Sequence, residues 1–486
     1  MTISLSNNEH DGSIPIGHVF GVDSRTGFMP PQPPLRRLPA QWETWESLLD
    51  TAIASTFVCS DALELIPEHA AASAAWRAKV REVGLVISCS ICSMHMMAYR
   101  FRVFVQIPIL PVTPEMAASP RLLRRAHLVL AFLLHFYVQT VPMNETIVVP
   151  RQIGVPILRV SNILDIPPLL TFSDTVLYNW EYKTPPCSSD SSSTSSEFDL
   201  EPPQLDNLRS TTMFTNLQDE EEFYLCSARI ELRGVEALEL MRQTMDEMFV
   251  GDEIAVRRIA GYLRTLAGVV DELKQLLLDV RKGCDPERYY RLVRPWFRGE
   301  DSDITGRRWI FEGVGDERGV GSEFEGLRQP TELSGPSAGQ SSMVHVLDVF
   351  LGVDHQSQAG DKPSFMSRML TYMPKNHRMF LKHLAGTPRP LRKFVDGVRD
   401  EELLESYNQA VLALKGFRDA HMIIATLYII GPARRAAAEA RRKKELEEGL
   451  KDEGKETPLK GTGGSDLVQF LKETRNRTGA TVISRS

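Results

Sequence analysis

Two residues in the C-terminal part of the chain, His421 and Arg418, have the types and the spacing of a cofactor site. They lie in Val411–Gly431, a strongly apolar stretch that we expect to be helical and to end at Gly431-Pro432. One face of this helix would carry residues at helical spacing, namely Leu414, Phe417, His421, Ile424, Ala425 and Tyr428. Because that face should point into the core, the imidazole needs a buried partner, and a metal ion is one such partner.

A histidine on an apolar helix face has two interpretations. Buried polar groups usually find ordinary partners within the protein, so a hydrogen-bonded core histidine is the more common outcome. Arg418, one turn before His421, favours the other interpretation, because a cation beside a ligand histidine suits a cofactor that carries carboxylates, such as haem. Haem iron is known to bind through a single histidine. The residues alone leave both interpretations open.

The other motifs that could do chemistry are weak. Cys89 and Cys92 form a CxxC pair, but no second pair completes a zinc site. The glycine-rich segments Gly313–Gly321 and Gly461–Gly464 lack a GK[ST] ending, which disfavours a nucleotide-phosphate loop. A flexible lid, or backbone that approaches a ligand closely, is the better interpretation of these glycines. No HExxH or G-x-S-x-G motif occurs, so hydrolase chemistry has no support.

Helical periodicity predicts most of the elements that must position these residues. No strand pattern of any length is present, so we expect an all-α fold. A charged stretch, Arg434–Glu453, is typical of a solvated helix or loop. The expected helices are Gln41–Leu65, one from Trp76, Arg121–Tyr137, one ending at Trp180, Phe223–Leu240, Glu253–Arg281, Tyr289–Trp296, Ser341–Val353, Ser364–Thr371, Met373–Leu384, Glu401–Gly416 and Ser465–Glu473.

Composition divides the chain into two helical domains. The segment 181–221 contains a serine run and acidic residues, cannot bury enough apolar surface to order itself, and is predicted to be a linker. It separates a small N-terminal domain, 27–180, from a large C-terminal domain, 222–475. We expect a disordered lead-in at 1–26 and a tail at 476–486.

An atypical insert, residues 83–106, interrupts the small domain. Its part Val83–Tyr99 contains no Asp, Glu, Lys or Arg. A membrane span is a marginal interpretation because the run is near the lower length limit. A redox or metal role for its CxxC pair is weakly supported. We favour an unspliced short intron translated in frame, because the composition differs from both flanks; detection of the segment in the mature transcript would reject this hypothesis.

Composition also limits the classes of protein. At 486 residues and 42% hydrophobic content the chain can bury a large core. The net charge of −7 argues against a general nucleic-acid binder. Six scattered cysteines fit a reducing compartment. The N-terminus has neither a basic start nor an apolar core, so we expect a cytoplasmic protein without a signal peptide.

Five motifs, in order along the chain, resemble the indoleamine 2,3-dioxygenase family, of fungal type. They are PRQIGVPILRVSNILDIPPLLTFSDTVLYNW from Pro150, GPSAGQSSMVHVLDVFLG from Gly335, YMPKNHRMFLKHL from Tyr372, FRDAH from Phe417 and GTGGSDLVQFLK from Gly461. The resemblance extends from about Gly27 to Lys472. It implies an all-α, two-domain enzyme that encloses haem b and opens the indole ring of L-tryptophan, or of another indoleamine, with O2. The implied product is N-formylkynurenine, on the kynurenine route towards NAD. It also implies a monomer that needs no nucleic acid or membrane.

The resemblance assigns roles to individual residues. His421 is expected to be the proximal ligand of the haem iron, and Arg418 to pair with a haem propionate. Arg294 matches the arginine that clamps the substrate carboxylate, a task for which a guanidinium suits better than an ammonium. Ser337 and Ala338 belong to a segment, Gly335–Ala338, that should pass close over the haem face, where small side chains leave room.

The distal side of the expected pocket is assigned in the same way. Phe223 and Ser227 lie one turn apart. They match the aromatic residue and the serine that, in the family, face the bound O2 and the indole ring of the substrate. Thr462 matches a residue that contacts the amino acid group of the substrate when its loop closes, which would exclude water.

Four positions depart from the pattern of vertebrate family members. Phe172 and Thr175 stand where those members have tyrosine and cysteine, and Tyr289 and Tyr290 replace two phenylalanines near the substrate arginine. The tyrosines add hydroxyls to an apolar wall. An alternative function is therefore a haem-binding relative with weak or no dioxygenase activity, although retention of Arg294 favours catalysis.

Overall fold

The computed structural model describes residues 20–62, 64–82, 109–185, 203–315, 324–355, 364–388, 390–448, 461 and 466–484. The expected all-α fold is confirmed, because helices make up nearly all the regular structure of these residues. The atypical insert, 83–106, lies outside the described residues. None of the described helices is long and apolar enough to cross a membrane.

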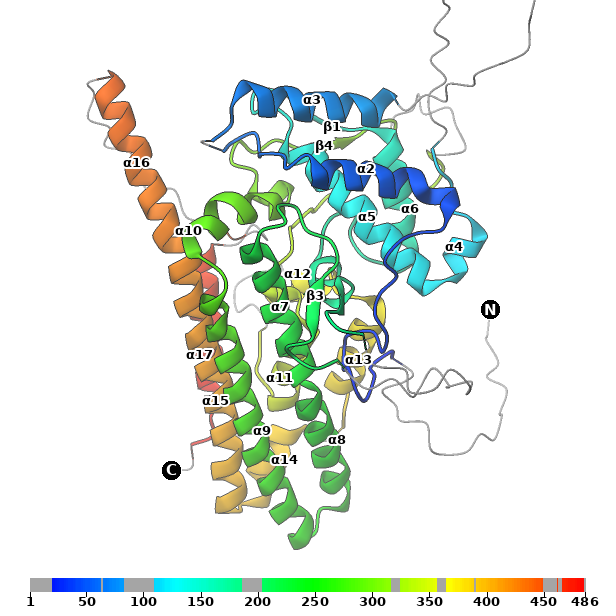
Figure 1. Ribbon diagram of the computed structural model, residues 1–486. Helices are drawn as coiled ribbons and strands as arrows, with labels where there is room; N and C mark the ends of the chain where they lie inside the picture. The colour runs from blue at the N-terminus through cyan, green and yellow to red at the C-terminus, as the bar shows by residue number, and fades with distance from the viewer. Residues whose placement is uncertain are drawn as a thin grey trace, which may run out of the picture.

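The N-terminal half is built around the buried helix α5, Pro120–Gln139. Ser119 caps this helix by accepting a hydrogen bond from the Leu122 N–H at 3.4 Å, and Pro120 stands at its first position, where a missing N–H costs nothing. Almost every residue from Leu123 to Val138 is buried, since other elements cover α5 on several sides. Those are α2 (Glu43–Ala54), α3 (Pro67–Glu82), α4 (Pro114–Ala118) and α6 (Arg151–Leu164) (Figure 1).

The C-terminal half is a bundle of long helices that run side by side in Figure 1. Its members are α7 (Gln218–Arg233), α8 (Val235–Val250), α9 (Glu253–Asp279), α15 (Glu401–Ala425) and α17 (Leu467–Ala480). The longest two, α9 and α15, pack against each other over much of their length. Each starts at an aspartate, Asp252 or Asp400, whose carboxylate accepts a backbone N–H of the first turn at 2.7 Å.

Shorter elements close the bundle and connect it to the N-terminal half. The helices are α10 (Pro286–Arg288), α11 (Ser342–Leu351), α12 (Phe365–Leu370), α13 (Lys375–Ala385), α14 (Leu391–Val398) and α16 (Gly431–Glu448). Two small sheets pair β1 (Ile147–Val149) in parallel with β4 (Trp309–Phe311), and β2 (Trp180–Tyr182) antiparallel to β3 (Leu208–Ser210). Three-residue strands are too short to show an alternating pattern, which is why the sequence did not predict them.

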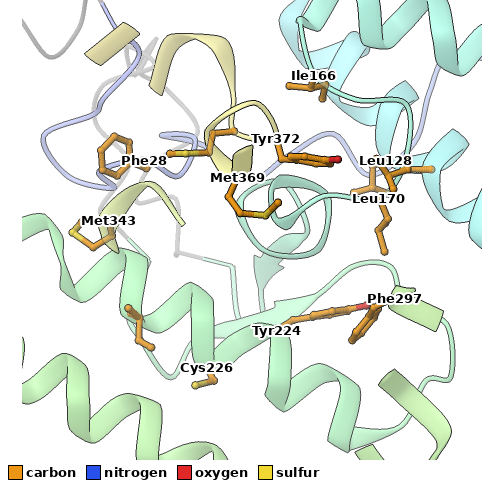
Figure 2. Close-up of a cluster of buried hydrophobic side chains, with 14 of the residues drawn as sticks. Phe28, Leu128, Ile166, Leu170, Tyr224, Cys226, Phe297, Met343, Met369 and Tyr372 are labelled. Atoms are coloured by element: carbon orange, nitrogen blue, oxygen red, sulfur yellow. The ribbon is translucent and has the colours of Figure 1, made fainter. Parts of the chain in front are cut away.

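One apolar core runs through both halves of the molecule. Figure 2 shows Leu128 and Leu170 from the N-terminal half near Tyr224 and Phe297 from the C-terminal half, and all four belong to the same buried cluster. The two halves are therefore packed together, and any site between them has rigid walls.

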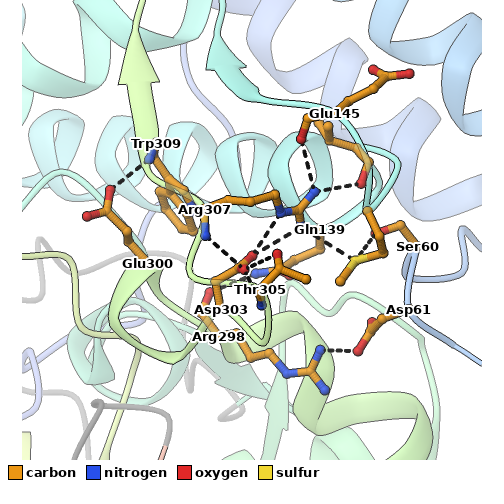
Figure 3. Close-up of polar contacts among 12 residues, drawn as sticks. Ser60, Asp61, Gln139, Glu145, Arg298, Glu300, Asp303, Thr305, Arg307 and Trp309 are labelled. Carbon is orange, nitrogen blue, oxygen red and sulfur yellow. Dashed lines mark hydrogen bonds and ion pairs between the residues drawn. The ribbon is translucent and has the colours of Figure 1, made fainter.

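Polar contacts reinforce this junction (Figure 3). The Arg307 guanidinium donates to the Pro142 carbonyl at 2.9 Å and pairs with Asp303 at 3.1 Å. Gln139, the last residue of α5, donates to the Arg298 carbonyl at 2.7 Å. These bonds hold the segment that follows Arg298 against the end of α5.

The predicted domain boundaries need three corrections. The linker prediction, 181–221, is too wide, because β2 at its start pairs with β3 inside it, and because Asp219 and Glu220 are buried in the first turn of α7. The lead-in prediction, 1–26, extends too far, because Val22 and Thr26 are buried. The tail prediction, 476–486, divides α17, which continues to Ala480. In each case tertiary contacts order a segment whose composition is polar.

Two predicted helix ends are also wrong. Gly431 and Pro432 do not stop the helix that carries His421; a π-helical turn, Thr426–Ile430, follows α15, and α16 continues directly from it. Proline is tolerated there because it stands in the first turn of α16, where its missing N–H costs little. The single helix predicted over Phe223–Leu240 is interrupted at Gly234, which separates α7 from α8.

Candidate active site

Two contiguous cavities lie between α7, α15 and α17. The first contains Arg418 in its lining and is called the Arg418 cavity; the second contains Arg294 and is called the Arg294 cavity. Their volumes are about 750 and 1020 Å³, and these figures include the solvent-filled space at the cavity openings. Their shared wall consists of Phe172, Ser227, Ala338, Gly339, His421, Phe470 and Leu471. The structure thus brings together most of the residues singled out in the sequence.

His421 projects from α15 to both cavities. Its ring is only partly buried and makes no hydrogen bond with any described residue, so the interpretation as a satisfied core histidine is not supported. Burial, with a smaller effect of Arg418, lowers the pKa of His421 to about 4. The imidazole is therefore neutral near pH 7 and keeps a lone pair that can bind a metal.

Arg418 is already paired within the protein. Its guanidinium donates to both carboxylate oxygens of Asp348 on α11, at 2.6 Å each, and to the hydroxyl of Thr478 on α17. Burial raises the pKa of Asp348, but Arg418 and His355 outweigh it and hold that pKa below its usual value. A buried cation needs a countercharge, and Asp348 supplies it for Arg418 within the protein. The pairing of Arg418 with a haem propionate stays a prediction.

Arg294 is buried at the start of a 3-10 turn, Arg294–Phe297. Its guanidinium lies over the ring of Tyr290, 5.6 Å from the ring centre, and lines the Arg294 cavity. Burial and the nearby Arg298 lower its pKa, but a guanidinium stays protonated at neutral pH. The cavity therefore contains a fixed positive charge that suits an organic anion.

Three π-helical turns border the Arg294 cavity. They are Ser173–Leu177, which contributes Thr175 and Val176, Tyr289–Val293, which contributes Tyr289, and Thr426–Ile430, which contributes Tyr428 and Ile429. π-Helical turns are rare and occur frequently at functional sites, because the extra residue redirects side chains. The sequence did not predict any of them.

Phe172 and Thr175 lie in the wall as expected. The N–H of Phe172 donates to the side chain of Gln340 at 2.8 Å, which links the Ser173–Leu177 turn to the loop that carries Ala338. The Thr175 hydroxyl approaches the carbonyl of Thr171 at 3.4 Å. The hydroxyl of Thr175 thus has a backbone partner one turn earlier, at Thr171, while the residue lines the cavity.

Phe223 and Ser227 share one face of α7, and Glu231 continues it one turn further on. The Phe223 ring lies 4.5 Å from that of Tyr289, so the aromatic wall is rigid. Serine in a helix often donates to a carbonyl one turn back, but Ser227 makes no hydrogen bond with any described residue. Its hydroxyl is available to a ligand in either cavity.

The segment Gly335–Ala338 reaches the cavities through Ser337 and Ala338. Ser337 caps a short turn by accepting the Gly339 N–H at 3.2 Å. At Gly335 a Cβ would lie 1.9 Å from the Phe297 carbonyl oxygen, so contact with protein backbone requires glycine at this position. The passage of the segment over a haem face stays a prediction.

Thr462 lies outside the described residues. Gly461, immediately before it, lines the Arg294 cavity, so the chain reaches the site at this point.

Sequence reasoning missed two parts of the site. The closing helix α17 provides Phe470, Leu471 and Thr474 to the wall. Glu231 lines the Arg418 cavity, where it accepts a hydrogen bond from the Ser341 hydroxyl at 2.6 Å, and burial raises its pKa to about 7. Glu231 follows Ser227 by four residues, so helical spacing could have placed its side chain on the same face of α7 as Ser227.

The residues present fit a haem. The neutral imidazole of His421 has no partner among the described residues and meets a largely apolar space. A single histidine is a known protein ligand of haem iron, whose remaining in-plane ligands belong to the cofactor. Arg418 supplies a cation beside the cavity.

In the described residues, an all-α fold places a neutral histidine and a buried arginine on one cavity, an arrangement that suits a haem-dependent oxidoreductase that binds an organic anion. The model of the family described as Indoleamine 2,3-dioxygenase matches residues 17–481. The chain belongs to this family, whose enzymes are haem-dependent, and it is an oxidoreductase of the dioxygenase type.

Individual relatives agree with this assignment. The chain is 32% identical to an indoleamine 2,3-dioxygenase of Saccharomyces cerevisiae, over 77% of this chain and 82% of the relative. It is 30% identical to indoleamine 2,3-dioxygenase 2 of Homo sapiens, over 74% and 79%. It is 29% identical to indoleamine 2,3-dioxygenase acdA of Aspergillus candidus, over 96% and 97%.

Proposed function

We propose that the protein opens the indole ring of L-tryptophan with O2 to give N-formylkynurenine, the first step of the kynurenine route towards NAD. The observation that carries this proposal is that the unpartnered imidazole of His421 and the buried guanidinium of Arg294 line one cavity. The first can hold a haem iron and the second can hold an amino acid carboxylate.

His421 would be the proximal ligand, and Ala338, Gly339 and Phe470 would pack against the haem. Arg418 would sit at the haem edge, with its remaining N–H groups near a propionate and with its charge balanced by Asp348. When bound, haem supplies the iron that activates O2.

The chain's own residues would bind and orient the substrate. Arg294 would hold the carboxylate in a two-point contact. Phe223 would pack against the indole ring, and the free hydroxyl of Ser227 would hydrogen-bond to the indole N–H or to O2. Thr462 would contact the amino acid group of the substrate and help to exclude water. Ring opening by both atoms of O2 needs no general base from the protein, consistent with the apolar wall.

A second candidate is a haem-binding relative with weak or no dioxygenase activity. The observation in its favour is the hydroxyl of Tyr289 in the wall next to Arg294. A polar group at this point could shift the substrate away from the position at which it reacts.

Haem loading and product formation would test the proposal. The protein is reconstituted with haem, reduced, and supplied with L-tryptophan and O2, while the ultraviolet absorbance of N-formylkynurenine is followed. We expect His421→Ala to lose both the haem spectrum and the product. His383→Ala, which changes an exposed histidine on α13, is the matched control and should retain both.

The two candidates predict different outcomes. A normal haem spectrum without product would favour the haem-binding relative. Unchanged haem affinity in His421→Ala would contradict the ligand assignment and with it the proposal.

A further inference from the structure

The side chain of Tyr289 is buried in the Arg294 cavity and has a hydroxyl without a partner. Only 3% of the residue is exposed, and its hydroxyl makes no hydrogen bond with any described residue. The hydroxyl is not among the buried, unsatisfied polar atoms of the described residues, so water can reach it through the cavity. A ligand that accepts a hydrogen bond can take the place of that water.

The π-helical turn places Tyr289 beside Arg294. The Arg294 N–H donates to the Tyr289 carbonyl oxygen and thereby closes the turn with an i→i+5 hydrogen bond. In an α-helix, with 3.6 residues per turn, two residues five apart would point about 140° away from each other. The wider turn brings both side chains into the lining of one cavity.

Neighbouring rings hold the phenol in position. The Tyr289 ring contacts Phe223 at 4.5 Å, Tyr428 at 5.8 Å and Phe297 at 6.5 Å between ring centres. Burial raises the pKa of Tyr289, and Arg294 opposes this effect only in part. The group is therefore a protonated donor at neutral pH, held in place before any ligand arrives.

We propose that the Tyr289 hydroxyl and the Arg294 guanidinium form a two-residue clamp for the carboxylate of the substrate. A carboxylate has two oxygens with about four acceptor positions, so it can bind a guanidinium and a phenol at once. The indole ring offers no comparable acceptor. This inference rests on the proposed function and names Tyr289 as a further substrate-positioning residue.

Binding of three ligands to the haem-loaded, ferric protein tests the clamp without any turnover. The ligands are L-tryptophan, indole-3-propionate, which keeps the carboxylate but lacks the ammonium, and tryptamine, which keeps the ammonium but lacks the carboxylate. Calorimetry measures each dissociation constant for the parent protein, for Tyr289→Phe and for Tyr290→Phe. Tyr290→Phe is the matched control, because it removes a hydroxyl that does not line the cavity and keeps the ring beneath Arg294.

We expect Tyr289→Phe to weaken L-tryptophan and indole-3-propionate about tenfold, since hydrogen bonds to charged groups contribute about 1.5–3 kcal/mol. Tryptamine binding should change less than twofold, and Tyr290→Phe should leave all three within twofold. Equal weakening of all three ligands by Tyr289→Phe, or no weakening of the two carboxylates, would overturn the clamp while leaving the proposed function intact. Failure of the parent protein to bind L-tryptophan would overturn both.

Discussion

Both oxygens of Asp348 accept hydrogen bonds from Arg418, one turn before His421 on α15. This ion pair connects α11 to the helix that carries the expected iron ligand. It therefore couples the position of His421 to the loop before α11, which forms another wall of the cavity. A buried pair of this kind is costly to break, because one charge is then left without a partner.

Asp348→Asn should consequently destabilise the protein by about 3–5 kcal/mol and weaken haem binding, since the amide cannot balance the charge of Arg418. Denaturant unfolding and haem titration would measure the two effects. The control is Asp271→Asn, which removes an exposed carboxylate paired with Lys274 on α9 and should change stability by less than about 1 kcal/mol. Equal effects of the two variants would contradict the role of Asp348.

Glu231 should make stability depend on pH. Its folded-state pKa of about 7 lies above the ordinary value of 4.5, so the folded protein favours the protonated form. Its contribution is fully present below pH 4.5 and is lost as the pH rises to about 7, to a total of about 3 kcal/mol. Unfolding measured at pH 5 and pH 7.5 should show this loss in the parent protein and a smaller loss in Glu231→Gln. Identical pH profiles would show that Glu231 does not titrate in this range.

Gly335→Ala should destabilise the loop that forms a wall of both cavities. The new Cβ would meet the Phe297 carbonyl oxygen at 1.9 Å, and this backbone atom cannot move easily. We expect a loss of about 1–3 kcal/mol and weaker haem binding. Gly397→Ala in α14, where a new Cβ would have no neighbour within 4 Å, is the matched control and should be neutral or slightly stabilising. Thermal unfolding of the two variants compares them directly.

Arg294→Lys should lower kcat/KM for L-tryptophan about 100-fold, mainly by raising KM, because an ammonium cannot make the two-point contact with a carboxylate. Arg291→Lys tests the same exchange three residues earlier, where the arginine pairs with Glu287 and Glu439 instead of lining the cavity. Steady-state kinetics should leave that control within about twofold of the parent protein. A similar loss in both variants would indicate a general effect on this segment.

Much of the fold was predictable because it depends on local patterns. Helical periodicity predicts the long helices Glu253–Arg281 and Glu401–Gly416, and the structure confirms a helix at both places, α9 and α15. The shared helix face of Phe223 and Ser227 follows from spacing alone. Helix ends were less predictable: Gly431 and Pro432 predict a stop, yet α16 begins at Gly431 directly after a π-helical turn, with the proline in its first turn.

The residues that carry the candidate site could be named from the sequence: His421 and Arg418 from helical spacing, and Arg294 and Ser227 from the resemblance to the family. Only the tertiary structure decided their partners. Asp348 meets Arg418 across 70 residues of chain, and no local pattern encodes a contact between two separate helices. The π-helical turn that places Tyr289 beside Arg294 could not be predicted from the sequence either. Such turns are rare, and no local sequence pattern distinguishes them from an α-helix.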